Sequence, residues 1–73
     1  MEMTIQQLEQ IAANRQTILF VYVDKAGNAT HRRAIPQDVR QNADGSWSIF
    51  SLDCDKNAIR QFKYVDMSGI RIV

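Results

Sequence analysis

The sequence is poor in the residues that build catalytic and metal centres. It has one cysteine, Cys54, and one histidine, His31, in 73 residues. One cysteine excludes an internal disulfide, and no cysteine–histidine cluster has the spacing of a zinc site. No serine has a partnering base, and a single histidine does not make a catalytic triad. The sequence therefore predicts a protein that is not an enzyme and that uses no metal or cofactor.

An excess of charge of one sign and long hydrophobic runs are also lacking. The formal net charge is +1, so composition alone does not indicate a nucleic-acid binder. No apolar run approaches the length that crosses a membrane, and residues 1–3 do not begin a signal peptide. We therefore expect a protein of the reducing cytoplasm that makes no contact with a membrane.

The chain is short, with an ordinary apolar content of 45%. This length predicts a single domain over residues 1–73, near the lower limit at which one hydrophobic core supports folding. A core of this size does not enclose a large ligand. Function is therefore expected on a face, on an edge or at an interface between subunits.

Residues 4–15 have the pattern of an amphipathic helix. Thr4 and Gln7 have the spacing of a capping box, in which each side chain bonds to the backbone of the other residue. Apolar residues then recur at helical spacing from Ile5 to Ala12. The helix is too short to be stable alone, so it must pack against the rest of the chain.

The remaining residues predict short antiparallel strands joined by turns. Gly27 and Asn28 are expected to supply positive φ in the first hairpin, and Pro36 is expected to stop the second strand. A helix followed by five strands with short links is typical of a small barrel capped by the helix. The expected strands are residues 17–23, 29–35 with a further pairing segment at 39–41, 46–52, 58–64 and 69–73.

Charged residues are distributed unevenly along these elements. Acidic residues fall largely in turns, where Asp53 and Asp55 are expected to accept local backbone hydrogen bonds. Residues two apart in a strand share a face, so Arg60 and Phe62 place a cation beside an aromatic ring. If the strands are neighbours, a nearly neutral protein carries a local basic patch. The residues of this patch would be His31, Arg32, Arg33, Arg60, Lys63 and Arg71.

The order of several short motifs resembles that of the WYL domain family over residues 17–73. The resemblance implies a small SH3-like or Sm-like barrel of the kind found in bacterial and phage regulators, often attached to a winged-helix DNA-binding domain. It also implies the binding of nucleic acids or nucleotide-like ligands. No winged-helix segment is found in these 73 residues, so a stand-alone module is expected. The motifs are Phe20-Val21-Tyr22, Gly27, Arg33-Ala34-Ile35-Pro36, Trp47, Ile59-Arg60-Gln61-Phe62-Lys63 and Ile70-Arg71-Ile72.

The resemblance also suggests a ligand site. The basic ligand-facing positions of the family would fall on Arg33 and Arg60. Its Trp-Tyr-Leu run would fall on Trp47, Ser48 and Ile49, so Ser48 stands where the family has tyrosine. The hypothesis is that these groups bind the phosphates of a single strand or a nucleotide. The predicted ligand-binding residues are Arg33, Arg60, Ser48, Trp47, Lys63 and His31.

Plainer interpretations stay open beside this hypothesis. The arginines could form surface ion pairs with Asp53, Asp55 or Asp66, and Trp47 could belong to the core or to an interface. A second functional hypothesis is a protein-interaction or assembly module, such as a small phage protein that modulates a host factor. In that case the partner is a protein or a second copy, and the last strand is a candidate pairing edge.

Overall fold

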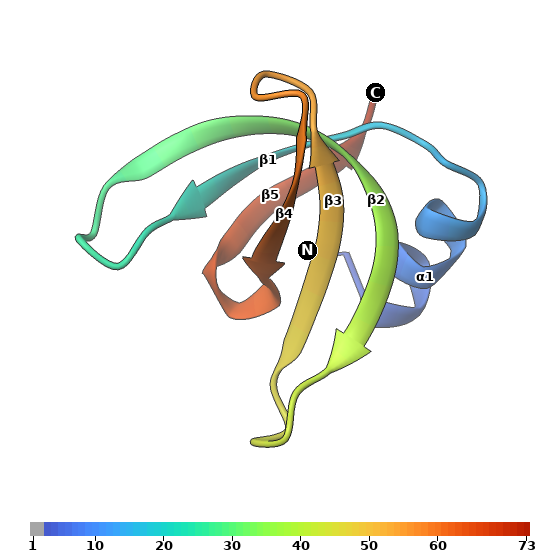
Figure 1. Cartoon of the computed structure of the whole chain (residues 1–73), viewed down its shortest axis with the longest axis horizontal. Helices are drawn as coiled ribbons and strands as arrows, with labels where there is room; N and C mark the ends of the chain where they lie inside the picture. The colour runs from blue at the N-terminus through green and yellow to red at the C-terminus, as the bar shows by residue number, and fades with distance from the viewer. Residues whose placement is uncertain (1–2) are drawn as a thin grey trace.

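The chain folds into one helix and five antiparallel strands, in the predicted order (Figure 1). The computed structural model describes residues 3–73. Predicted and observed bounds agree to within a residue or two, except at the end of the second strand. The elements are α1 (Ile5–Ala13), β1 (Ile18–Val23), β2 (Ala29–Gln41), β3 (Trp47–Asp53), β4 (Ala58–Lys63), the 3-10 turn η1 (Tyr64–Asp66) and β5 (Met67–Ile72).

The five strands form one strongly curved sheet that is not closed. Its order is β4-β3-β2-β1-β5, which leaves β4 and β5 at opposite edges. Among residues 3–73 no backbone ladder joins these edges, so the predicted SH3-like or Sm-like barrel is not confirmed. A side-chain bond spans part of the gap, because the backbone N–H of Lys63 donates to the Tyr22 hydroxyl at 3.1 Å.

The second strand continues past its proline, and the prediction that Pro36 stops it is wrong. The pairing of β2 with β3 shifts by one residue between Pro36 and Asp38, which is a β-bulge. A bulge tolerates the missing N–H of proline, so the strand resumes and the predicted pairing at 39–41 is confirmed. The extra residue, Gln37, accepts a 2.6 Å hydrogen bond from Nη1 of Arg15.

The helix begins at the predicted capping box. The backbone N–H of Thr4 donates to Oε1 of Gln7 at 2.8 Å, and the backbone N–H of Gln7 donates to Oγ1 of Thr4 at 3.1 Å. Leu8 and Ile11 are buried on one side of α1, which lies beside β2 (Figure 1). The helix thus covers part of the concave side of the curved sheet.

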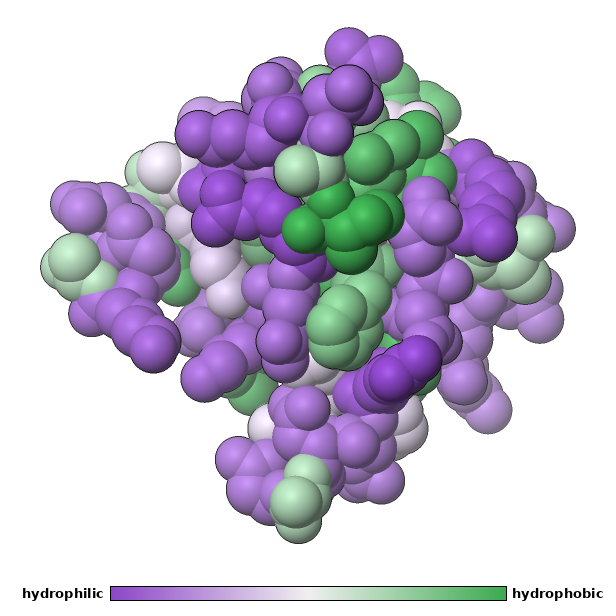
Figure 2. All heavy atoms as spheres, viewed as in Figure 1, coloured by the Kyte–Doolittle hydropathy of each residue, from purple (hydrophilic) through white to green (hydrophobic). Residues whose placement is uncertain are grey.

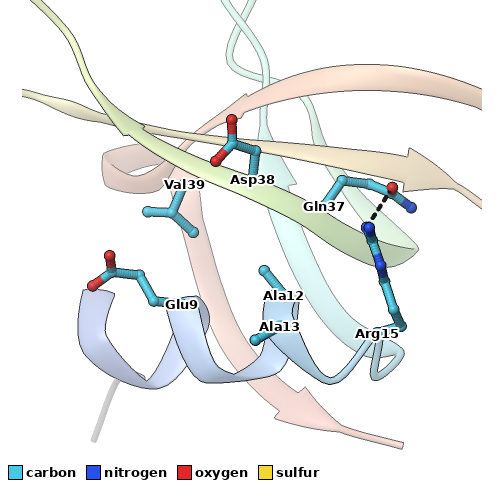
Figure 3. A pocket seen from close by; sticks show the side chains of 7 residues that line it. All are labelled: Glu9, Ala12, Ala13, Arg15, Gln37, Asp38 and Val39. Atoms are coloured by element: carbon cyan, nitrogen blue, oxygen red, sulfur yellow. Dashed lines mark hydrogen bonds between the residues drawn. The ribbon is translucent and has the colours of Figure 1, made fainter.

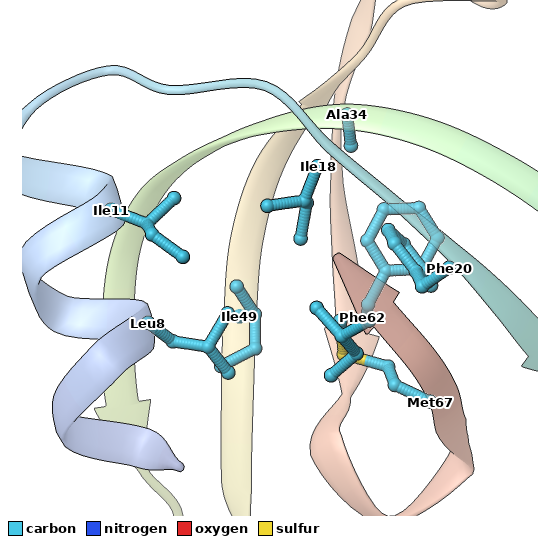
Figure 4. Close-up of a cluster of buried hydrophobic side chains, with 9 residues drawn as sticks. Leu8, Ile11, Ile18, Phe20, Ala34, Ile49, Phe62 and Met67 are labelled. Carbon is cyan, nitrogen blue, oxygen red and sulfur yellow. The ribbon is translucent and has the colours of Figure 1, made fainter. Parts of the chain in front are cut away.

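The hydrophobic core lies between α1 and the sheet (Figure 4). Three aromatic rings meet there edge to face, with 5.1 Å between the ring centroids of Phe20 and Phe62 and 4.9 Å between those of Tyr22 and Phe62. We call the sheet face that carries this core the concave face, and the opposite one the convex face. The core residues are Leu8, Ile11, Ile18, Phe20, Ala34, Ile49, Phe62, Met67 and Ile70.

The turns follow the expected local chemistry in most places. Gly27 has a φ of 86°, as predicted, but Asn28 is not among the described residues with positive φ; its N–H donates to the side chain of Asp24 instead. In the next turn, hydrogen bonds to Asp44 from the hydroxyl and then the backbone N–H of Ser46 hold the pKa of that carboxyl below its usual 3.8.

Candidate anion-binding surface

The pairing register decides which side chains share a face, because directly paired residues of an antiparallel sheet point to the same side. Arg33 pairs with Leu19, next to the buried Ala34 of the concave face, so Arg33 lies on the convex face. Arg60 pairs with Ser51 and is two residues from the core ring of Phe62, so it lies on the concave side. The structure does not bring Arg33 and Arg60 together.

Arg33 instead shares its face with His31 of its own strand and with Arg71 of β5, which lies on the far side of β1. Leu19 of β1 pairs with Arg33 of β2 on one side and with Arg71 of β5 on the other. Val21, two residues further along β1, pairs with His31 of β2, so His31 lies on the same face as Arg33. We call His31, Arg33 and Arg71 the convex basic cluster. Next to it lies a depression of about 300 Å³, whose lining includes Leu19, Val21, His31 and Arg71.

The three residues of this cluster are available to a ligand. All are exposed, and none of their side chains has a hydrogen bond or an ion pair within residues 3–73. Half-buried Leu19 and Val21 lie between the strands that carry them. The surface therefore combines free cations with an apolar floor, which suits an anion that has an apolar body, such as a nucleotide.

Arg32, one residue before Arg33, has a different role. It pairs with Phe20 on the concave side, and its Nη1 lies 3.3 Å from Oδ2 of Asp53. Asp53 is fully buried and also accepts from the backbone N–H groups of Asp55 and Lys56. The local bonds to Asp53 were predicted from the turn sequence, whereas its burial and its partner Arg32 were not. Arg32 therefore neutralises a structural carboxylate.

Arg60 and Lys63 lie on the edge strand β4, apart from the convex basic cluster. Both line a groove of about 200 Å³ that Tyr22 borders from β1. Neither side chain has an ion pair within residues 3–73, so the surface pairs considered for Arg60 do not form. Lys63 pairs with Ser48 and faces the convex side, so it and Arg60 point to opposite faces. These residues form a second basic region.

Trp47 and Ser48 do not form an exposed surface on which a nucleic-acid base could stack. Trp47 is half-buried and shares the concave side with Ile49 of the core. Ser48 is fully buried, and its Oγ accepts from Nδ2 of Asn42 at 2.9 Å and from Nε2 of Gln61 at 2.8 Å. Its hydroxyl has no exposed surface to offer a ligand, so the geometry does not support Ser48 as a contact.

A further hollow lies between α1 and β2, away from all predicted site residues (Figure 3). It has a volume of about 270 Å³ and a small apolar floor that includes Ala12 and Val39. The guanidinium of Arg15 at its side is held by Gln37. Within residues 3–73, no group of three or more histidine, cysteine, aspartate or glutamate side chains is placed to hold a metal ion.

Arg71 was missed as a site residue by reasoning from the sequence. Its position in a basic, β-branched segment did show that it belongs to a strand. Its closeness to Arg33 depends on the pairing of β5 with β1 and on a bulge opposite Leu19–Val21, where Gly69 has a φ of 61°. No feature of the linear sequence specifies that pairing.

These features define a small, mainly β domain with an open curved sheet and a basic outer surface. The sequence model of the WYL domain family matches residues 3–72, nearly the whole chain. The chain therefore belongs to the WYL domain family, whose members are often regulatory and bind ligands or nucleic acids. A comparison with curated proteins finds no match. Within residues 3–73, no helix is long and apolar enough to cross a membrane.

Proposed function

We propose that this protein is a non-enzymatic regulatory module that binds single-stranded nucleic acid or a nucleotide-like anion on its convex face. The observation that supports the proposal is the convex basic cluster. His31 and Arg33 come from β2 and Arg71 comes from β5, on either side of β1. Their side chains have no hydrogen bond or ion pair within residues 3–73, and they flank the apolar residues Leu19 and Val21 of β1. Guanidinium groups bind phosphate oxygens in a bidentate way, and apolar side chains contact bases or sugars.

The segregation of charge by face strengthens this proposal. Asp38 is the strand carboxylate on the convex side, and it is already paired with Arg40 at 2.6 Å. The carboxylate of Asp53 lies on the opposite side and is paired with Arg32. A nearly neutral chain therefore presents an excess of positive charge on one face, which attracts polyanions at close range.

Fluorescence anisotropy with labelled single-stranded DNA and RNA tests the proposal. If three phosphates are contacted, raising salt from about 50 to about 200 mM weakens binding roughly twentyfold, because about two counterions are released from a single strand. Arg33→Ala and Arg71→Ala are expected to weaken binding and to flatten this salt dependence. Competition by an unlabelled mononucleotide distinguishes recognition of one nucleotide from recognition of a strand.

The matched control is Arg60→Ala, which removes the same charge from the opposite face. It is expected to leave nucleic-acid binding nearly unchanged. Binding that survives the loss of both Arg33 and Arg71, or that depends equally on Arg60, would contradict the assignment of this surface.

A further inference from the structure

The outer edge of β4 has free backbone groups. Among residues 3–73, β4 pairs with β3 alone. The N–H of Lys63 donates to the Tyr22 hydroxyl, which shows that it points away from β3. In an antiparallel strand, the N–H and C=O of one residue point to the same side and alternate along the chain. The N–H and C=O groups of Gln61 and Ile59 therefore also point outward, where they are open to another strand.

An apolar row of the convex face ends at the same edge. Ile35, Leu52 and Ile59 follow one another across β2, β3 and β4 in the pairing register. The first two are half-buried, whereas Ile59 at the end of the row is 59% exposed. Figure 2 shows hydrophobic atoms gathered on this side of the molecule, over β3 and its neighbours. A strand added beside β4 would extend this row with its own apolar side chain.

The side chain of Arg60 lies on the concave side of the same edge strand. Arg60 is exposed, and its side chain has no hydrogen bond or ion pair within residues 3–73; it borders the groove of about 200 Å³ beside β4. Two carboxylates also line this groove: Asp24, which accepts from the N–H groups of its own turn, and Asp66, which lies beyond the end of β4. The charge offered to a residue directly opposite Arg60 is therefore positive.

A second copy of this chain fits the edge poorly. Two copies could pair their β4 strands antiparallel, using the outward backbone groups of Ile59 and Gln61. In that register Ile59 of one copy lies opposite Gln61 of the other, and the two Arg60 side chains lie directly opposite each other. Like charges in that position are destabilising. The other edge strand, β5, has no acidic residue to offer, carries Arg71, and is interrupted by the bulge at Gly69. The positive charge of this edge is therefore complementary to a different chain that carries acidic residues.

We propose that β4 is a docking edge for an extended acidic segment of a partner protein. The segment adds as a sixth strand and bonds to the backbone of Ile59 and Gln61. It presents an apolar residue beside Ile59 and a carboxylate beside Arg60, in an apolar–acidic–apolar sequence. This mode of binding, β-strand addition, takes affinity from main-chain bonds and specificity from alternate side chains. The inference does not depend on the convex basic cluster.

The test uses the whole chain, labelled with ¹⁵N, and a capped synthetic peptide in which valine and glutamate alternate. We expect saturable amide shifts concentrated in β4 and slower hydrogen exchange at the amides of Ile59 and Gln61. A peptide with lysine in place of glutamate is expected to bind at least about tenfold more weakly. Absence of saturable binding, or shifts centred on another element, would overturn the proposal.

Variants separate edge pairing from general attraction between charges. Arg60→Glu is expected to invert the preference between the two peptides, while Arg33→Glu, the same charge change on the convex face, leaves it unaltered. Ile59→Pro removes an outward N–H that no strand of this sheet uses, so it is expected to abolish strand addition. If Ile59→Pro does not fold, the inversion by Arg60→Glu decides the matter.

The free chain provides the last control. Light scattering is expected to show a monomer, with rapidly exchanging amides at Ile59 and Gln61. A dimer in which these two amides are already protected would assign the edge to a second copy and overturn the proposal.

Discussion

The concave face of the sheet is partly covered by α1 and filled with apolar side chains, whereas the convex face leaves Leu19 and Val21 half-buried beside the unpaired side chains of the convex basic cluster. Two consecutive arginines show the difference. Arg32 points to the concave side and neutralises the buried Asp53, while Arg33 points to the convex side and its side chain has no hydrogen bond or ion pair within residues 3–73. In this small domain one face of the strands packs the core, and the opposite face of the same strands presents the cations on which the proposed anion binding depends.

The largest expected effect sharpens this comparison within β4. Phe62→Ala is expected to lower the free energy of unfolding by about 3–5 kcal/mol, because the ring is 1% exposed and contacts the rings of Phe20 and Tyr22. Ile59→Ala, on the convex side of the same strand, is expected to cost less than about 1 kcal/mol. Urea unfolding of the two variants measures both values, and equal losses would contradict the division between faces.

A smaller effect is expected for the paired arginines. Arg32→Ala leaves the buried carboxylate of Asp53 without its cation and is expected to cost about 2–3 kcal/mol. Arg33→Ala is expected to change stability by less than about 0.5 kcal/mol while weakening anion binding. Thermal or urea unfolding measures the stability of the two variants, and fluorescence anisotropy measures their anion binding. A loss of stability in Arg33→Ala that matches Arg32→Ala would break the comparison.

The smallest effect concerns the buried hydroxyl of Ser48 on the convex face. Ser48→Ala removes the acceptor shared by the side-chain amides of Asn42 and Gln61 and is expected to cost about 1 kcal/mol. Ser68→Ala, at an exposed position of β5, is the matched control and is expected to be neutral. Urea unfolding separates them. If Ser48→Ala instead abolished nucleic-acid binding at unchanged stability, a direct ligand contact at Ser48 would be supported.

Much of the fold could be predicted because it depends on neighbours in the sequence. The capping box of Thr4 and Gln7 and the backbone bonds to Asp53 join groups at most three residues apart. The pairing of the second strand past Pro36 was predicted only in part. Proline lacks the N–H donor that a regular ladder needs, but a β-bulge accommodates this loss and lets the strand continue. Closure of the barrel was also expected, and the sheet order shows that it does not occur.

The candidate site was harder to predict because it depends on strands that are distant in the sequence. Alternation assigned Arg60 and Phe62 to one face, and the register confirms it. Alternation within strands cannot relate the face of Arg33 to that of Arg60, since the turns and the pairing between strands set that relation. His31 and Arg33 were both predicted as ligand-binding residues and lie two apart on one face of β2, whereas Arg71 was absent from the predicted set.

The sequence by itself determined the helix, the five strands, their turns and membership of the WYL domain family, because these follow from local hydrogen bonding and from the order of short motifs. Only the tertiary structure decided that Arg33 shares a face with Arg71 instead of Arg60, that Asp53 is buried with Arg32, and that within residues 3–73 β4 has a strand on one side alone. The physical reason is that cross-strand register and sheet order are collective properties of packing around one core, which no single strand encodes.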